Sequence, residues 1–202
     1  MWKGNLFMDK LYECAASYQK LLGVNYKIIL GRKGKLIELR ICFEPLHFHH
    51  LIGLHKLTDL RIARENREKV FNRILSGAVT YDSIARSRYF RIAEQRMEPF
   101  SHFEEILDQN RLVFRYNDKK NLFSLIEADY LLSTPYGCTD IYIFVAETHG
   151  KGTYFCRSFF PKEDRDYTAG QTIYTMLYKE KIYLDTGKAV VQYDRLTPKA
   201  TT

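Results

Sequence analysis

The hydrophobic positions of the chain follow two different periods, and the change falls near residue 111. Residues 8–22 carry apolar side chains three and four positions apart, which predicts an amphipathic helix. Residues 26–43 alternate as two strands, joined by a turn whose glycines permit positive φ. Helical spacing returns over residues 45–110, where Pro45 suits the first turn of a helix. This half of the chain therefore predicts a helix, a hairpin and a longer helical region.

From residue 111 the apolar positions alternate with polar ones in six short stretches separated by Asn, Asp, Gly and Pro. Short connections between consecutive strands favour an antiparallel meander. The predicted fold class is α+β, with a helical region beside a twisted antiparallel sheet. The expected organisation is a single domain over residues 1–202, made of an N-terminal helix and hairpin extension (1–44), a helical region (45–110), an antiparallel sheet (111–196) and a flexible tail (197–202).

The charge of the chain is moderately basic and unevenly distributed. The 31 Lys and Arg exceed the 24 Asp and Glu by seven, and hydrophobic residues make up 46% of the 202 positions, enough for a globular core. Between Lys56 and Arg96 ten basic residues face five acidic ones, so this stretch alone contributes +5. Two interpretations remain open: a surface that meets a polyanion, or solvated helix faces balanced by acids at helical spacing.

The cysteine pattern and the absence of targeting signals predict a reduced, cytoplasmic protein without a membrane segment. Cys14, Cys42, Cys138 and Cys156 lie far apart and form no CxxC pair, so neither a zinc site nor a disulfide framework is indicated. The N-terminus shows no secretory signal pattern. No apolar run approaches the roughly 20 residues that cross a bilayer.

The stretch "FHHLIGLHKL", residues 48–57, places three of the six histidines in ten residues. If residues 46–59 form one helix, the leucines define an apolar face that includes His50. His50 then reads most simply as a buried histidine, whereas His49 lies on the opposite side with Lys56.

The remaining polar residues of this helix suggest two candidate arrangements. His49 and Lys56 flank Gly53, which leaves a notch for a phosphate or ribose; the alternative is an exposed polar face with Gly53 serving helix packing. His55 and Asp59 share the i,i+4 spacing, which suits either an oriented acid/base pair or a surface pair. The histidine spacings match no common metal-ligand pattern, so no metal or other cofactor is predicted.

A second cluster lies in residues 154–181. Arg157 stands in the middle of a hydrophobic strand, where a charged side chain needs a partner or a ligand. An edge-strand charge or a structural salt bridge would equally explain it. Candidate substrate-binding residues in this cluster are Phe155, as a stacking platform, together with Ser158, Thr172, Tyr174 and Lys179.

Four stretches carry a resemblance to a known family: "FHHLIGLHKL", "FSLIEADYLL", "YFCRSFFPK" and "QTIYTMLYKEKI". They resemble the fourth group of the phage-associated barnase, EndoU, colicin and RelE-like nucleases, over nearly the whole chain. The resemblance implies helices followed by an antiparallel meander, with a site on the open face of the sheet. It also implies a metal-independent ribonuclease with a base, an acid and cations, encoded by a phage or mobile element.

The leading hypothesis is therefore an RNA-cleaving enzyme. Histidine suits acid/base roles because its pKa lies near neutrality, and the expected catalytic residues are His49, His50, His55, Lys56 and Arg157. RNA, single-stranded or structured, is the expected partner. One alternative is a non-catalytic phage accessory or counter-defence protein that binds a host protein or nucleic acid; another is an enzyme that acts on a nucleotide or cofactor.

Overall fold

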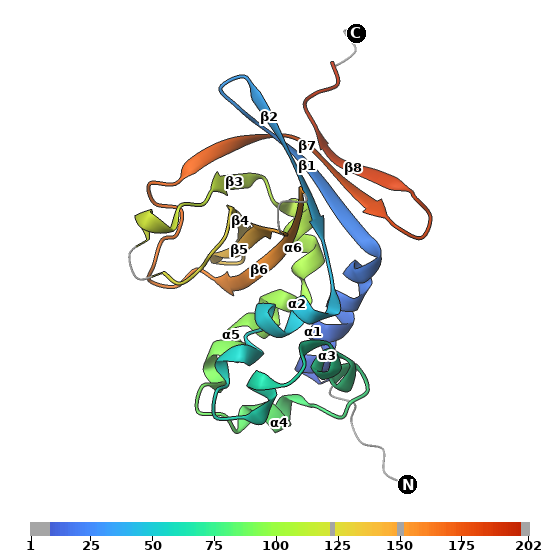
Figure 1. The fold of residues 1–202 in the computed structure, drawn as a ribbon, viewed down its shortest axis with the longest axis vertical. Coiled ribbons are helices and arrows are strands. Elements are labelled where there is room, and N and C mark those ends of the chain that lie inside the picture. Colours follow the sequence, from blue (N-terminus) through green and yellow to red (C-terminus); the bar gives the residue numbers. More distant parts are fainter. Residues whose placement is uncertain (1–8, 122–123, 149–151, 199–202) are drawn as a thin grey trace.

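The computed structural model describes residues 9–121, 124–148 and 152–198, and it divides into a helical half and a β-barrel half (Figure 1). Met8 and most of the expected tail lie outside the described residues. The described residues form six α-helices and four short 3₁₀ turns, two of which connect the second helix to the third. Their bounds are α1 Lys10–Gln19, α2 Pro45–Leu51, α3 Arg67–Leu75, α4 Tyr81–Ala85, α5 Phe90–Ser101 and α6 Phe103–Gln109, with 3₁₀ turns η1 Lys20–Gly23, η2 Leu54–Lys56, η3 Arg61–Arg64 and η4 Asp118–Lys120.

The first helix forms where the apolar stripe predicts it. Asp9 caps α1 by accepting hydrogen bonds from the backbone N–H groups of Leu11 and Tyr12, which would otherwise lack partners. Of the predicted stripe, Leu11, Cys14, Ala15 and Tyr18 are buried, as expected for a helix that packs one face on the core. No helix among the described residues is long and apolar enough to cross a membrane; α5, at 12 residues, is the longest of them.

The sheet half contains the two hairpin strands and all six strands predicted after residue 111. The α+β class is confirmed, but the antiparallel meander is wrong. The strands follow the order β1-β2-β6-β5-β4-β3-β7, and β7 pairs with β1 to close a seven-stranded barrel. The bounds are β1 Val24–Arg32, β2 Lys35–Cys42, β3 Leu112–Arg115, β4 Tyr130–Tyr136, β5 Thr139–Glu147, β6 Thr153–Pro161, β7 Thr172–Tyr183 and β8 Ala189–Asp194.

The hairpin β1–β2 is the reason that the sheet closes. β2 pairs in parallel with β6 through Arg40 and Ile41, and β1 pairs antiparallel with β7 over most of its length. These two pairings make the sheet mixed, and closure satisfies strand edges that an open meander would leave exposed. β8 pairs with β7 alone and ends the sheet outside the barrel.

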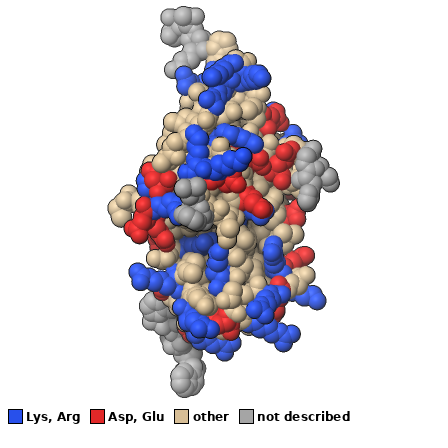
Figure 2. Space-filling view, turned by 60° about the vertical axis from the view of Figure 1, so that its left-hand side comes forward, with Lys and Arg blue, Asp and Glu red and all other residues tan. Residues whose placement is uncertain are grey.

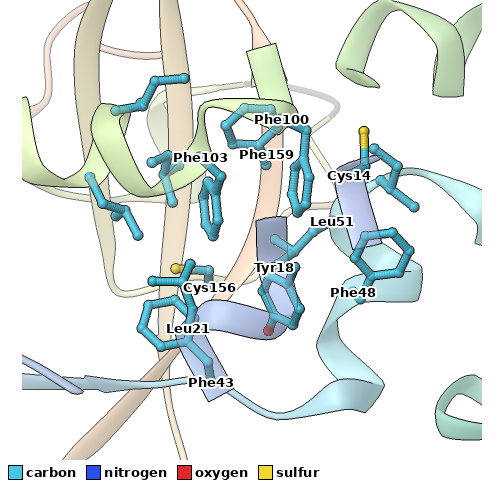
Figure 3. Packing of buried hydrophobic residues seen from close by; sticks show 14 of the residues in the cluster. Cys14, Tyr18, Leu21, Phe43, Phe48, Leu51, Phe100, Phe103, Cys156 and Phe159 are labelled. Carbon is cyan, nitrogen blue, oxygen red and sulfur yellow. The ribbon is translucent and has the colours of Figure 1, made fainter. Parts of the chain in front are cut away.

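One core joins the two halves (Figure 3). Tyr18 of α1 packs against aromatic rings from several helices, including Phe48, Phe100 and Phe103. Phe159 of β6 lies edge-on to Phe100 and Phe103, with ring centroids 5.0 and 5.2 Å apart. Strand β6 is thereby held against the helices, and this contact sets the position of the residues described next.

Candidate functional site

The histidine-rich segment folds back on itself because its helix stops early. α2 ends at Leu51 and Gly53 adopts φ +87°, a left-handed conformation that favours glycine. A Cβ at Gly53 would lie 3.3 Å from the Nε of Arg96, so the chain also needs glycine for close packing. After this turn, η2 brings the His55 ring onto the His50 ring, with centroids 3.7 Å apart and planes 7° from parallel.

This turn reverses the expected roles of two histidines. His49 was expected on the open side of a continuous helix, but it is only 1% exposed and its Nε2 lies 2.9 Å from the carbonyl oxygen of Ile62. The expected burial of His50 is also wrong, because His50 is half-buried and lines a pocket. The leucines on the two sides of Gly53 do not belong to one helix, because α2 ends at Leu51 and η2 begins at Leu54, so one helical phase does not place all three histidines. The notch between His49 and Lys56 is therefore absent.

The expected His55–Asp59 pair is likewise not formed. Asp59 accepts hydrogen bonds from the Ser87 hydroxyl at 2.6 Å and the Arg88 backbone N–H at 2.9 Å. It thereby holds the connection between α4 and α5, and His55 turns to His50 instead.

The strand β6 supplies the opposite wall through a β-bulge. Cys156 pairs with Val145 and Ser158 pairs with Phe144, so Arg157 is the extra residue of the strand. A bulge redirects side chains, and it often does so beside functional sites. Arg157 and Ser158 both line the pocket that contains His50 and His55. The Arg157 Nη2 also donates a hydrogen bond to Glu127 at 3.0 Å, the structural salt bridge that was one alternative for this residue.

We call this space the histidine pocket. It has a volume of about 520 Å³ and lies where the helical half meets β6 and the β6–β7 connection. Figure 2 shows Lys and Arg side chains around the hollowed lower half of the molecule, which is the helical end. The lining residues used below are His50, His55, Lys56, Arg96, Arg157, Ser158, Phe160, Glu163 and Tyr167.

Three cations and one carboxylate face this pocket. Lys56, Arg96 and Arg157 supply the positive charge and Glu163 the negative charge. Arg96 is the unusual member because it is only 8% exposed. Its Nη1 donates to the carbonyl oxygen of Leu51 at 3.1 Å, and no carboxylate within the described residues forms an ion pair with it. Burial lowers the pKa of Arg96 to about 10. A buried cation of this kind is well suited to bind an anion.

The two stacked imidazoles are neutral at pH 7. Burial, reinforced by the surrounding cations Arg67, Arg96, Arg157 and Lys56, lowers the pKa of His50 to about 4. Burial and the neighbouring His50 lower the pKa of His55 to about 2. Two imidazolium rings at this separation would repel each other, so the pair behaves as one acceptor for a single proton. The arrangement places a proton acceptor beside groups that attract phosphate.

Two further hollows adjoin the histidine pocket, and Arg157 lines both of them. The smaller, about 190 Å³, is also bordered by His50 and by His47, whose ring stacks on Phe155 with centroids 4.6 Å apart. The larger, about 620 Å³, includes Arg115 and four carboxylates. Arg157 therefore lies at the junction of the three hollows, and Phe155 lines the smaller hollow together with His50.

Three of the expected substrate-binding residues lie elsewhere. Lys179 is 1% exposed and donates hydrogen bonds to the carbonyl oxygens of Leu107 and Asp108 at the end of α6; burial lowers its pKa to about 7. Thr172 and Tyr174 pair with β3 at the start of β7, and neither lines the histidine pocket.

Sequence reasoning did not single out Arg96 or Gly53 for their actual roles. Arg96 was one of ten cations in a basic stretch, and no local feature marked it as buried. Gly53 did carry a usable signal, since glycine commonly follows the last turn of a helix. Within residues 9–121, 124–148 and 152–198, no group of three His, Cys, Asp or Glu side chains is placed to hold a metal ion.

The chain is an α+β protein with a pocket in which two histidines lie beside three cations. A family model described as phage-Barnase-EndoU-ColicinE5/D-RelE like nuclease 4 matches residues 10–196. The chain therefore belongs to this nuclease-like family, and membership indicates a nuclease with a nucleic-acid substrate. Searches of the curated proteins and of the solved structures gave no match.

Proposed function

We propose that the protein is a metal-independent ribonuclease, encoded by a phage or mobile element, that cleaves RNA in the histidine pocket. The observation that carries the proposal is the stacked His50–His55 pair, neutral at pH 7 and surrounded by cationic side chains. His49 is left out of the reacting group because it is buried against Ile62.

The chemistry needs one group that removes the proton of the 2′-hydroxyl and a source of a proton for the leaving 5′-oxygen. His50 accepts the proton of the ribose 2′-hydroxyl as the 2′-oxygen forms a bond to phosphorus. The bond between phosphorus and the 5′-oxygen breaks on the opposite side of phosphorus; that oxygen takes a proton from water, and the imidazolium gives its proton to the resulting hydroxide. The products are a 2′,3′-cyclic phosphate and a 5′-hydroxyl. The ring of His55, stacked on His50, keeps the acceptor in position.

The cations stabilise the charge that develops on the phosphorane. Arg96 of α5 and Arg157 of β6 both line the pocket, together with Lys56. These same charges lower the pKa of His50 in the free protein. A bound phosphate offsets them and raises the pKa, so His50 accepts a proton more readily with substrate present. Ser158, which lines the pocket, orients the phosphate, and Phe155, which lines the adjoining smaller hollow, contacts a base.

The two alternative functions make different predictions. A protein that only binds does not need a histidine in the same pocket as Arg157, whereas His50, His55 and Arg157 share one pocket here, which favours catalysis. An enzyme acting on a free nucleotide should show little dependence on salt. Binding of a single-stranded polymer should weaken steeply as salt rises.

The test is incubation of the purified protein with total bacterial RNA in excess EDTA. Wild type should give discrete fragments, and His50→Ala, His55→Ala and Arg157→Ala should each lose cleavage while remaining folded. His102→Ala is the matched control, because His102 pairs with Glu105 and does not line the pocket. An inactive wild type at high concentration, or equal loss in His102→Ala, would contradict the proposal.

A further inference from the structure

The upper end of the barrel carries a second basic pocket, away from the histidines. Along β1 the inward face reads Val24, Tyr26, Ile28 and Leu30, all buried, and the next position on that face is Arg32. Lys35 is the register partner of Arg32, so both cations extend the apolar inner face of the hairpin. The tip of this hairpin projects beyond the rest of the barrel in Figure 1.

These residues surround a hollow of about 260 Å³, which we call the hairpin pocket. It is lined by Arg32, Lys33, Lys35, Ile37 and Tyr174, with no carboxylate among them. None of the three cations forms an ion pair with another described residue. Three unpaired cations around one hollow attract an anion with several charges.

The turn of the hairpin places a lysine in a strained conformation. Lys33 has φ +47°, and it is the one non-glycine residue with positive φ in the part of the chain that the structure describes. Gly34 follows with φ +76°, which makes a two-residue turn where asparagine is favoured at the first position. A lysine at this position is less favourable for the turn than asparagine would be, and it adds a third cation to the hairpin pocket.

Tyrosines continue inward from the hairpin pocket. The Arg32 guanidinium lies 5.4 Å from the centroid of the Tyr174 ring, and Tyr174 meets Tyr130 at 6.2 Å. On the far side, Arg115 lies over Tyr130 at 5.0 Å and lines the same hollow as Arg157. Tyr130 is buried in the core, so Tyr174 is the ring that borders the hairpin pocket; a tyrosine beside cations is typical of surfaces that bind single-stranded nucleic acid.

We propose that the hairpin pocket binds backbone phosphates of the same RNA strand at a distance from the cleaved bond. The inference rests on the proposed function for the identity of the polymer. Arg115, which lies between the two pockets, is paired with Asp129 at 3.1 Å. Phosphate contacts are therefore concentrated in the histidine pocket and the hairpin pocket. Only an RNA strand long enough to reach both pockets gains binding affinity from the hairpin pocket.

The test measures binding separately from cleavage, with fluorescently labelled 2′-O-methyl RNA, whose blocked hydroxyl prevents the proposed reaction. One strand has about 20 nucleotides and one about four. The tested variant combines Arg32→Gln, Lys33→Asn and Lys35→Gln. The control removes the same charge from exposed positions elsewhere with Lys20→Gln, Lys188→Gln and Arg195→Gln. Asparagine tolerates the turn, so the tested variant should keep the thermal stability of wild type.

Loss of three phosphate contacts lowers the salt slope for a single strand by about two. Between about 50 and 200 mM salt, wild type should therefore lose about 20-fold more affinity for the long strand than the variant does. The short strand should bind both proteins equally, and the control should resemble wild type. A wild-type slope in the variant, an equal change in the control, or no binding by wild type would overturn the inference. If this pattern appears but wild type cleaves no RNA in EDTA, the proposed ribonuclease function is contradicted, whereas phosphate binding by the hairpin pocket is supported.

Discussion

Replacement of Arg96 by methionine should lower the rate of RNA cleavage while leaving the stability of the fold nearly unchanged. The guanidinium is buried, donates to the Leu51 carbonyl at 3.1 Å, and has no carboxylate partner among the described residues. Methionine keeps the length and apolar stem of the side chain but removes the charge.

The structure predicts that this substitution changes stability little. Burial lowers the pKa of Arg96 from 12.5 to about 10, which corresponds to about 3 kcal/mol for keeping the charge inside the protein. The lost hydrogen bond from a charged donor is worth about 1.5–3 kcal/mol. The two effects nearly cancel, so the free energy of unfolding should change by less than about 2 kcal/mol. For a chain of this size, that corresponds to less than about 8 °C in melting temperature.

Activity should respond very differently. If Arg96 contacts the phosphate that becomes more negative in the transition state, Arg96→Met should lower kcat by about 10²–10³-fold. The same variant should raise the pKa of His50, because the charge of Arg96 contributes to its lowering; an NMR titration of the imidazole signals measures this shift. Urea unfolding, cleavage assays and the titration are done on one preparation. Full activity with unchanged His50 titration, or a loss of stability well above 3 kcal/mol, would refute the reasoning.

Three further predictions concern the histidine segment. His49→Ala should lower the free energy of unfolding by about 1–3 kcal/mol, because it leaves the Ile62 carbonyl without its partner; a wild-type melting temperature would contradict this. Gly53→Ala should lower the free energy of unfolding by about 1–2 kcal/mol, because residue 53 has a positive φ, and it should reduce cleavage because the added Cβ displaces Arg96. A wild-type stability together with a wild-type cleavage rate would contradict this. The folded protein keeps His50 neutral down to about pH 4 while the unfolded chain gains the proton near pH 6.5, so the free energy of unfolding should fall as pH drops through that range, less steeply in His50→Asn.

The elements of the fold were predictable because they depend on local patterns. The stripe of α1 and the alternation after residue 111 record which face of each element is buried, and both are read directly from spacing. The closure of the barrel was not predictable in this way. It depends on pairing between β1 and β7, and between β2 and β6, which are separated by more than a hundred residues. Alternation shows that a strand has an inner face but does not identify its neighbour.

The site was predictable in composition but not in geometry. The sequence identified His50, His55, Lys56 and Arg157 as candidate site residues, and these four line one pocket. The orientation of the histidines depended on whether the helix continued through Gly53, and one left-handed residue exchanged the buried and open positions. Arg96 reaches the pocket from a helix about forty residues further along the chain, and only packing of α5 against the histidine segment brings it there.

The central claim is that the histidine pocket cleaves RNA through its 2′-hydroxyl without a metal. The most direct test uses one single-stranded RNA and the same sequence with a single 2′-deoxy substitution at the mapped cleavage position, both in excess EDTA. Wild type should cut the RNA to a 2′,3′-cyclic phosphate and leave the substituted bond intact, and His50→Ala should cut neither strand. Cleavage at the deoxy position, or cleavage by His50→Ala at the wild-type rate, would contradict it.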